Sequence, residues 1–269
     1  MLAKPIITLT TDFGLKGPFA GAMKGVILGI NPEAEIVDIS HAITPQNVFE
    51  AAQVISMSHK YFPPSTIHVA VVDPGVGGLR KPLLLVAENY YFIGPDNGVF
   101  TQIFEQYKNH FQAIHLTTLR YFRSHISSTF HGRDIFAPVA AWLSKGVGIK
   151  KFGKPLNNYV TLEFPKPELI GKSTFRGEII YIDGFGNAMT NITGNNLNTI
   201  FQNIPMNRLK VFYKNKKLSF SNCYEEKTIS GLSAIINSFG YLELFLFKGK
   251  ASERFDIKIG DNVSIKKGD

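Results

Sequence analysis

Three segments of the chain carry side chains that can bind and activate a small polar molecule. Asp12 follows an apolar run, Asp73 opens the loop DPGVGG after a second run, and His131 stands just before an amphipathic stretch. Arg80 lies seven residues after Asp73, so its guanidinium can fold back onto that carboxylate. An acid, a guanidinium and an imidazole in one place can position a water molecule and move its proton.

Each of these side chains also has an ordinary structural explanation. Asp12 is either a turn or capping residue or a carboxylate that holds a ribose diol. The glycines after Asp73 suit a plain turn as well as a loop whose backbone approaches a ligand closely. His131, taken alone, is more typical of a structural histidine. Their shared position favours a functional site, because these segments leave strands or enter helices at the sheet edge where open parallel sheets bind ligands.

The segment IDGFGN at residues 182–187 is a second candidate site. Glycine, aspartate and asparagine are typical of a tight hairpin turn. As a ligand clamp, Asp183 would bind an ammonium group, Phe185 would offer a ring face, and Asn187 would hydrogen-bond the edge of a heterocycle. Local chemistry leaves both explanations open.

The elements around the first site predict an α/β layered domain with a mostly parallel sheet over residues 1–150. Apolar residues recur at a period near 3.6 after Pro18, and Asn31-Pro32 ends that helix. Helices are expected after Pro18, Pro45, Gly98 and Asp134. Strands are expected at Pro5–Thr10, Glu35–Ile39, Ile67–Val72, Pro82–Ala87, Tyr90–Ile93 and Ala113–Leu116.

The apolar residues within residues 151–172 follow no sustained period, and the segment is interpreted as a linker. Residues 173–269 then predict a smaller domain, an antiparallel sheet or β-barrel of short strands separated by turn residues. Its expected strands are Phe175–Ile182, Met189–Ile192, Leu209–Tyr213, Leu218–Ser221, Tyr241–Phe247 and Asn262–Ile265.

The composition is that of a globular protein, with 44% hydrophobic and 19% charged residues among 269. The net charge of +8 suits an anionic partner, but the basic residues are scattered. The densest group, Lys210, Lys214, Lys216 and Lys217, is expected to be a solvated hairpin. No nucleic-acid partner is therefore expected.

Cys223 is the single cysteine, so no disulfide within the chain is expected. Residues 1–11 lack the features of a signal peptide. No apolar run approaches the roughly 20 residues that span a bilayer. These features favour a soluble, cytoplasmic protein with no membrane partner.

Six segments resemble, in the same order along the chain, the SAM hydroxide adenosyltransferase family, where SAM is S-adenosyl-L-methionine. Relatives of that family include the SAM fluorinase and chlorinase. The segments are TLTTDFG at 8–14, VVDPGVGG at 71–78, IGPDNGVF at 93–100, TFHGRDIFAPVAA at 129–141, IDGFGNAMTNI at 182–192 and NSFGYLEL at 237–244. Each segment alone is weak evidence for the resemblance, but six matches in the same order over both predicted domains are specific evidence for it.

The resemblance implies that Asp73, Arg80 and His131 handle an attacking water and that Asp12 binds the ribose diol of SAM. The stretch DPGVGG stands where the halogenases have a hydroxyl-bearing halide loop, and Phe239 stands where they carry arginine. The resemblance therefore implies water or hydroxide as the nucleophile.

The resemblance also assigns residues of the smaller domain. Asp183 and Ser238 match groups that hold the methionine moiety. Asn187 matches an adenine contact, Phe185 lines that pocket, and Ala251, in the segment KAS, matches a backbone contact to adenine.

The expected reaction is cleavage of SAM by water or hydroxide at the ribose 5′ carbon, which gives adenosine and L-methionine. The sulfonium is already a good leaving group, so no metal or other cofactor is expected. His131 and Asp73 are both candidates for the proton acceptor. The family resemblance also implies a homotrimer with sites between the large domain of one subunit and the small domain of its neighbour.

Two other functions stay open. Asp12, Asp73, His131 and Asp134 can instead form an oxygen-and-nitrogen metal site in a metal-dependent phosphatase or nucleotidase. The chain can also be a non-catalytic SAM- or adenosine-binding protein. The presence of the acid, the guanidinium and the imidazole together weighs against an inert binder.

Overall fold

In a computed structural model the chain divides into two compact units, residues 1–162 and 163–269. The structure describes residues 4–108, 110–171, 173–202, 204–226 and 231–267, so the first three residues of the N-terminal segment lie outside it. Within these ranges, no helix combines the length and the apolar character needed to cross a membrane.

Strands and helices alternate through the first unit. Its strands are β1 (Ile6–Thr11), β2 (Glu35–Ser40), β3 (Ile67–Val71), β4 (Pro82–Ala87), β5 (Tyr90–Pro95), β6 (Phe111–Leu116) and β7 (Gly153–Pro155). Its α-helices are α1 (Phe19–Ile30), α2 (Val48–Ser58), α3 (Thr101–Gln106) and α4 (Ala137–Ser144). A π-helical turn at Gly132–Phe136 leads directly into α4. Short 3₁₀ turns lie at His59–Tyr61, Leu119–Tyr121 and Ile149–Lys151.

These strands form one sheet in the order β2-β1-β3-β5-β4-β6-β7. The pairs β2–β1, β1–β3 and β3–β5 are parallel, which confirms the predicted α/β class. The strands β4, β6 and β7 extend the sheet with antiparallel pairs. A tight turn at Glu88–Asn89 joins β4 to β5, and so short a connection cannot make a parallel crossover.

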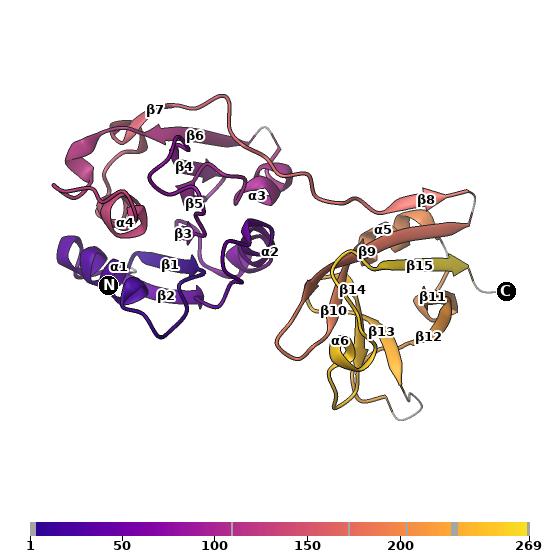
Figure 1. The fold of residues 1–269 in the computed structure, drawn as a ribbon. Coiled ribbons are helices and arrows are strands. Elements are labelled where there is room, and N and C mark those ends of the chain that lie inside the picture. The colour runs from indigo at the N-terminus through magenta and orange to yellow at the C-terminus, as the bar shows by residue number, and fades with distance from the viewer. Residues whose placement is uncertain (1–3, 109, 172, 203, 227–230, 268–269) are drawn as a thin grey trace. The chain divides into compact units, whose positions relative to one another are not determined.

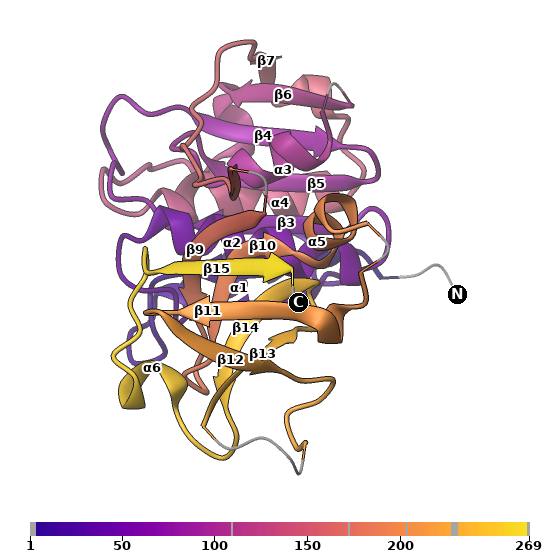
Figure 2. The ribbon, with the colours of Figure 1, turned by 90° about the vertical axis from the view of Figure 1, so that its right-hand side faces the viewer.

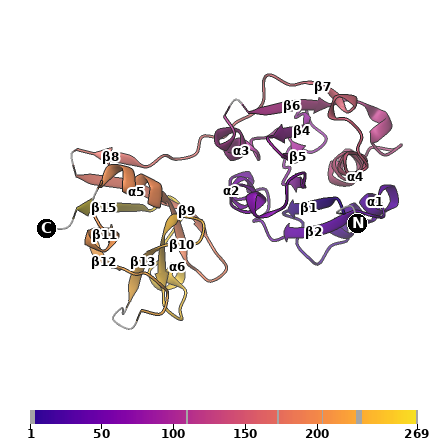
Figure 3. The same cartoon turned by 180° about the vertical axis from the view of Figure 1, so that it is seen from behind.

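Helices cover both faces of this sheet (Figures 1 and 3). On one face α1 packs against α4, where Ile27 and Val139 join the same buried cluster as the strands. On the other face α2 packs against α3, with Ile55 and Ile103 in a second cluster. Since both faces are filled, polar loops emerge at the ends of the strands, where they can meet a ligand.

The second unit is built mainly from strands. They are β8 (Glu168–Ile170), β9 (Thr174–Ile182), β10 (Ala188–Thr193), β11 (Leu209–Tyr213), β12 (Lys216–Phe220), β13 (Leu232–Ile236), β14 (Tyr241–Leu246) and β15 (Asn262–Lys267). Two helices accompany them, α5 (Gly194–Ile200) and α6 (Ala251–Arg254), besides a 3₁₀ turn at Met206–Arg208.

The strands of the second unit close into a barrel (Figure 2). They follow the order β10-β14-β13-β12-β11-β15-β9, and β9 pairs back onto β10, while β8 lies outside on β9. The predicted barrel-like domain is confirmed. The β11–β12 hairpin turns at Lys214 and Asn215, both at positive φ, and exposes Lys216 and Lys217 as predicted.

Some elements have no counterpart among the predictions, namely β7, β8, β13, α5 and α6. The segment expected as a linker supplies β7 to the first sheet and β8 to the edge of β9, outside the barrel. Its middle is held to the first unit, because the backbone N–H of Val160 donates to Asp96 at 2.8 Å and Tyr159 stacks on Phe104. Such contacts join residues far apart in sequence, so no local period reveals them.

Gly177 in β9 gives a test of barrel packing. A Cβ there would lie 2.2 Å from Oδ1 of Asn191 and 2.5 Å from Cγ1 of Ile192. Gly177→Ala is expected to lower the free energy of unfolding by about 1–3 kcal/mol, because the barrel wall must move. Gly21→Ala is the control: in α1 no atom lies within 4 Å of the added Cβ, so that variant should be neutral or more stable. Denaturant titration compares them, and equal stability of the two variants would contradict the packing argument.

Candidate functional site

Asp73, Arg80 and His131 meet at one edge of the first sheet. Nε of Arg80 donates to Oδ1 of Asp73 at 2.9 Å, and its Nη2 donates both to Oδ2 of Asp73 and to Nδ1 of His131, the latter at 2.7 Å. The side chains of Asp73 and Arg80 are 3% and 9% exposed. The predicted pairing of Arg80 with Asp73 is confirmed, and the guanidinium bridges the carboxylate and the imidazole.

Glycine shapes the loop that carries Asp73. Gly77 has a φ of 77°, and a Cβ there would lie 2.1 Å from the carbonyl oxygen of Ser128. This close approach seats the loop against the segment that leads to His131, and a larger residue would push the two apart. His131 itself precedes the π-helical turn, a feature often found at functional sites.

The contact with Arg80 determines the protonation of His131. Arginine has no acceptor atom, so Nδ1 of His131 must accept from it and the ring proton resides on Nε2. Burial lowers the pKa of His131, and the charge of Arg80 lowers it further, against opposing effects of Asp73 and Asp134. The ring is therefore neutral at neutral pH and offers an N–H donor.

Residues behind the cluster support it. The guanidinium carbon of Arg80 lies 5.4 Å from the ring centroid of Phe136, which is fully buried. Burial raises the pKa of Asp134, but hydrogen bonds from Arg133 and from the Ser127 backbone give a net lowering. Its carboxylate is thus used in structural contacts. In the part of the chain that the structure describes, no three His, Cys, Asp or Glu side chains are grouped as metal ligands.

Asp12 leaves β1 beside the Asp73 loop, because Thr11 pairs with Val71 across β1 and β3. Its Oδ2 accepts from the backbone N–H of Gln46 at 2.8 Å. Gln46 has a φ of 66°, a conformation that is costly for a residue other than glycine and that often marks a functional site. The hydrogen bond orients the Asp12 carboxylate, whose oxygens keep further acceptor positions for a diol.

Asp183 organises the β9–β10 hairpin of the second unit. Its Oδ1 accepts from the backbone N–H of Phe185 at 2.9 Å and of Asn187 at 2.8 Å, and its Oδ2 accepts from Nδ2 of Asn187 at 3.3 Å. Ile182 pairs with Ala188, so the hairpin explanation is confirmed. Phe185 is 78% exposed, so the same turn also offers the ring face that the clamp explanation needs.

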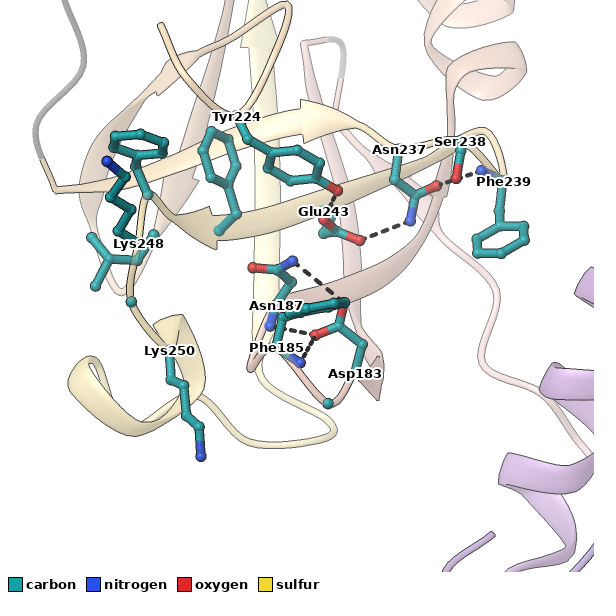
Figure 4. A pocket seen from close by; sticks show the side chains of 15 residues that line it. Asp183, Phe185, Asn187, Tyr224, Asn237, Ser238, Phe239, Glu243, Lys248 and Lys250 are labelled. Atoms are coloured by element: carbon teal, nitrogen blue, oxygen red, sulfur yellow. Dashed lines mark hydrogen bonds between the residues drawn. The ribbon is translucent and has the colours of Figure 1, made fainter. Parts of the chain in front are cut away.

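The hairpin borders a pocket of about 760 Å³ within the second unit (Figure 4). Asp183, Phe185, Asn187 and Ser238 all line it. Ala251 is fully buried at the start of α6, next to the lining residue Lys250. The backbone N–H of Ser252 donates to the carbonyl of Gly186 at 2.8 Å, which ties α6 to the hairpin.

Three residues of this pocket were missed by sequence reasoning: Tyr224, Asn237 and Glu243. Glu243 on β14 accepts from the Tyr224 hydroxyl at 2.8 Å and from Nδ2 of Asn237 at 2.9 Å. Burial raises the pKa of its carboxyl group, against these two hydrogen bonds. The signal was the lone acidic residue in the apolar run YLELFLF, because a buried glutamate has to be hydrogen-bonded.

The protonation of His131 gives a test of the cluster. Arg80→Met removes the nearby cation, so the pKa of His131 should rise from its lowered value in an NMR titration of the imidazole resonances. Lys81→Met, which removes the next positive charge along the chain, is the control and should leave the pKa of His131 unchanged. An unchanged pKa in Arg80→Met would contradict the electrostatic role of the guanidinium.

Comparison with known proteins bears on both units. Residues 7–153 match the model of the SAM hydroxide adenosyltransferase N-terminal domain, and residues 177–264 match that of the C-terminal domain. The chain is 37% identical to the (R)-S-adenosyl-L-methionine hydrolase of Methanocaldococcus jannaschii, over 97% of this chain and 95% of the relative. It is 31% identical to the protein of the same name from Salinispora arenicola, over the full length of both.

A solved structure supports the same relationship. A protein of Thermotoga maritima matches with a TM-score of 0.89 and 35% sequence identity, over 97% of this chain and 100% of that one. The similarity therefore extends through both units, in sequence and in fold. The chain belongs to the SAM hydroxide adenosyltransferase family.

Proposed function

We propose that this protein hydrolyses S-adenosyl-L-methionine, with water or hydroxide attacking the ribose 5′ carbon to give adenosine and L-methionine. The observation that carries the proposal is the hydrogen-bonded cluster of Asp73, Arg80 and His131 in a chain of this family. The hydrolase relatives cover nearly the whole chain, which supports the same reaction here.

The substrate supplies a good leaving group, because the bond from the ribose carbon runs to a sulfonium. The protein has to hold an oxygen nucleophile in line with that bond, and such positioning is worth up to about 7–11 kcal/mol. Arg80 places a positive charge beside the nucleophile and favours hydroxide character on it. Methionine leaves with the electron pair of the broken bond, so this scheme calls on no metal ion or other cofactor.

His131 and Asp73 have different parts in this scheme. The Nδ1 atom of His131 accepts a hydrogen bond from Arg80, so the ring donates its Nε2–H to the water oxygen. Asp73 then accepts the proton of the water as the new carbon–oxygen bond forms and the oxygen becomes acidic. Of the two proton acceptors that the sequence left open, we therefore propose Asp73.

Residues in both units are proposed to bind the substrate. Asp12 holds the ribose diol, Asp183 and Ser238 hold the amino-acid end, and Phe185 and Asn187 contact adenine. The exposed ring of Phe185 and the pocket beside the hairpin support this assignment.

Substitutions should separate chemistry from binding. Arg80→Ala and His131→Ala should still bind SAM but slow its cleavage by about 10²–10⁴-fold. Asp12→Ala is the contrasting variant and should weaken adenosine binding by about 10–100-fold, because it removes hydrogen bonds to a charged acceptor. Chromatography of adenosine and methionine in the presence of EDTA measures turnover, and calorimetry measures binding. Full turnover by the Arg80 and His131 variants would refute the assignment of the water-handling residues.

We also propose that the protein is a homotrimer whose sites are shared between the large domain of one copy and the small domain of its neighbour. The family resemblance supports this assembly. Leu15 and Leu79, near Asp12 and Asp73 in sequence, are 86% and 103% exposed in the single chain, so both are available for contact with another copy.

Light scattering tests the assembly. Wild-type protein should have three times the 29.9 kDa mass of one chain, and Leu79→Asp should shift it toward smaller species with loss of turnover. Leu119→Asp makes the same substitution at a leucine that is 69% exposed and lies far from Leu15 and Leu79 in sequence, and it is the control for charge alone. A fully active monomer would contradict the shared site.

A further inference from the structure

A buried glutamate joins two walls of the pocket in the second unit. Glu243 is 5% exposed, and its two oxygens accept separately from Tyr224 and Asn237. Figure 4 shows Tyr224 on one side of Glu243, and Asn237 with Ser238 on the other. These partners come from different segments, since Tyr224 follows β12 and Asn237 begins the turn between β13 and β14.

Asn237 links Glu243 to the turn that carries Ser238. Its Oδ1 accepts from the backbone N–H of Phe239 at 3.0 Å and of Tyr241 at 3.1 Å. Its Nδ2 donates to Glu243. The oxygen faces two donors and the nitrogen faces a carboxylate, so the amide has one favourable orientation. Glu243 therefore supports the conformation of the turn through Asn237.

Tyr224 forms the aromatic wall. Its ring packs edge-on against Phe245, with centroids 5.0 Å apart, and both residues line the pocket. Burial raises the pKa of the Tyr224 hydroxyl, and the hydrogen bond to Glu243 raises it further, so the hydroxyl stays protonated and donates. The residue is 47% exposed, which leaves ring surface for a ligand.

We propose that Glu243 is a positioning residue that fixes the aromatic wall at Tyr224 and the turn at Asn237–Ser238 relative to each other. The nucleoside end of the substrate then binds against the aromatic wall while the amino-acid end binds at the turn. This role rests on the proposed function, because it assigns the two ends of SAM to the two walls. Glu243 acts through its two neighbours and needs no contact with the substrate.

Four substitutions test separately the two hydrogen bonds of Glu243, one to Tyr224 and one to Asn237. Glu243→Gln keeps both hydrogen bonds, because its amide oxygen can accept from Asn237 and its amide nitrogen can donate to the Tyr224 oxygen. Glu243→Leu removes both. Tyr224→Phe removes the hydrogen bond from Tyr224 and keeps the aromatic ring, and Asn237→Ala removes the hydrogen bond from Asn237.

Tyr213→Phe is the matched control. It deletes a tyrosine–carboxylate hydrogen bond of the same kind, 2.6 Å long to Asp261, in the same barrel but outside the pocket lining. Calorimetry with adenosine alone and with L-methionine alone measures the two ends separately. Initial rates with SAM give kcat and KM for each variant.

Tyr224→Phe should weaken adenosine binding by about fivefold to tenfold and leave methionine binding unchanged, since one hydrogen bond to a charged group is lost. Asn237→Ala should do the reverse. Glu243→Leu should weaken both ligands and raise KM more than it lowers kcat. Glu243→Gln and Tyr213→Phe should stay within about twofold of wild type.

The proposal would be overturned if Tyr224→Phe and Asn237→Ala each weakened adenosine binding and methionine binding equally. It would also be overturned if Glu243→Gln were as impaired as Glu243→Leu. If these outcomes occur while the wild type converts SAM, the role of Glu243 fails and the proposed function stands. If the wild type leaves SAM intact, both fail together.

Discussion

The candidate active site depends on one buried cation, the guanidinium of Arg80. A charge at 9% exposure is stable only when it is paired, and Asp73 supplies that pair through two hydrogen bonds. The pairing leaves Nη2 directed at His131 and thereby selects the neutral ring with its proton on Nε2. The ion pair thus sets the geometry of the loop and the chemistry of the imidazole at the same time.

The surrounding structure maintains this ion pair. Gly77 permits the close approach to Ser128 that brings the Asp73 loop to the segment before His131. Phe136 packs under the guanidinium from the π-helical turn. Two other carboxylates also accept hydrogen bonds from the backbone: Asp12 accepts from the N–H of Gln46, and Asp183 accepts from the N–H groups of its own hairpin. In each case the residue proposed to meet the substrate also stabilises the backbone that presents it.

Much of the fold could be predicted from local sequence patterns. Apolar runs and a period near 3.6 residues located most strands and helices of the first unit, and the spacing from Asp73 to Arg80 indicated their pairing. Chemistry that depends on distant contacts could not be read in this way. The pairing of β15 with β9, the pairing of β10 with β14 and the hydrogen bond of Glu243 to Tyr224 each join segments that are well separated in the chain. The protonation of His131 also follows only from the three-dimensional contact with Arg80.

The central claim is that water attacks the ribose 5′ carbon at the Asp73–Arg80–His131 cluster. Incubation of the protein with SAM in ¹⁸O-enriched water, with EDTA present, and mass spectrometry of the products tests this claim most directly. The account predicts that the label appears in the 5′ hydroxyl of adenosine and that methionine is unlabelled. Label in the amino-acid product, or intact SAM after long incubation, would contradict it.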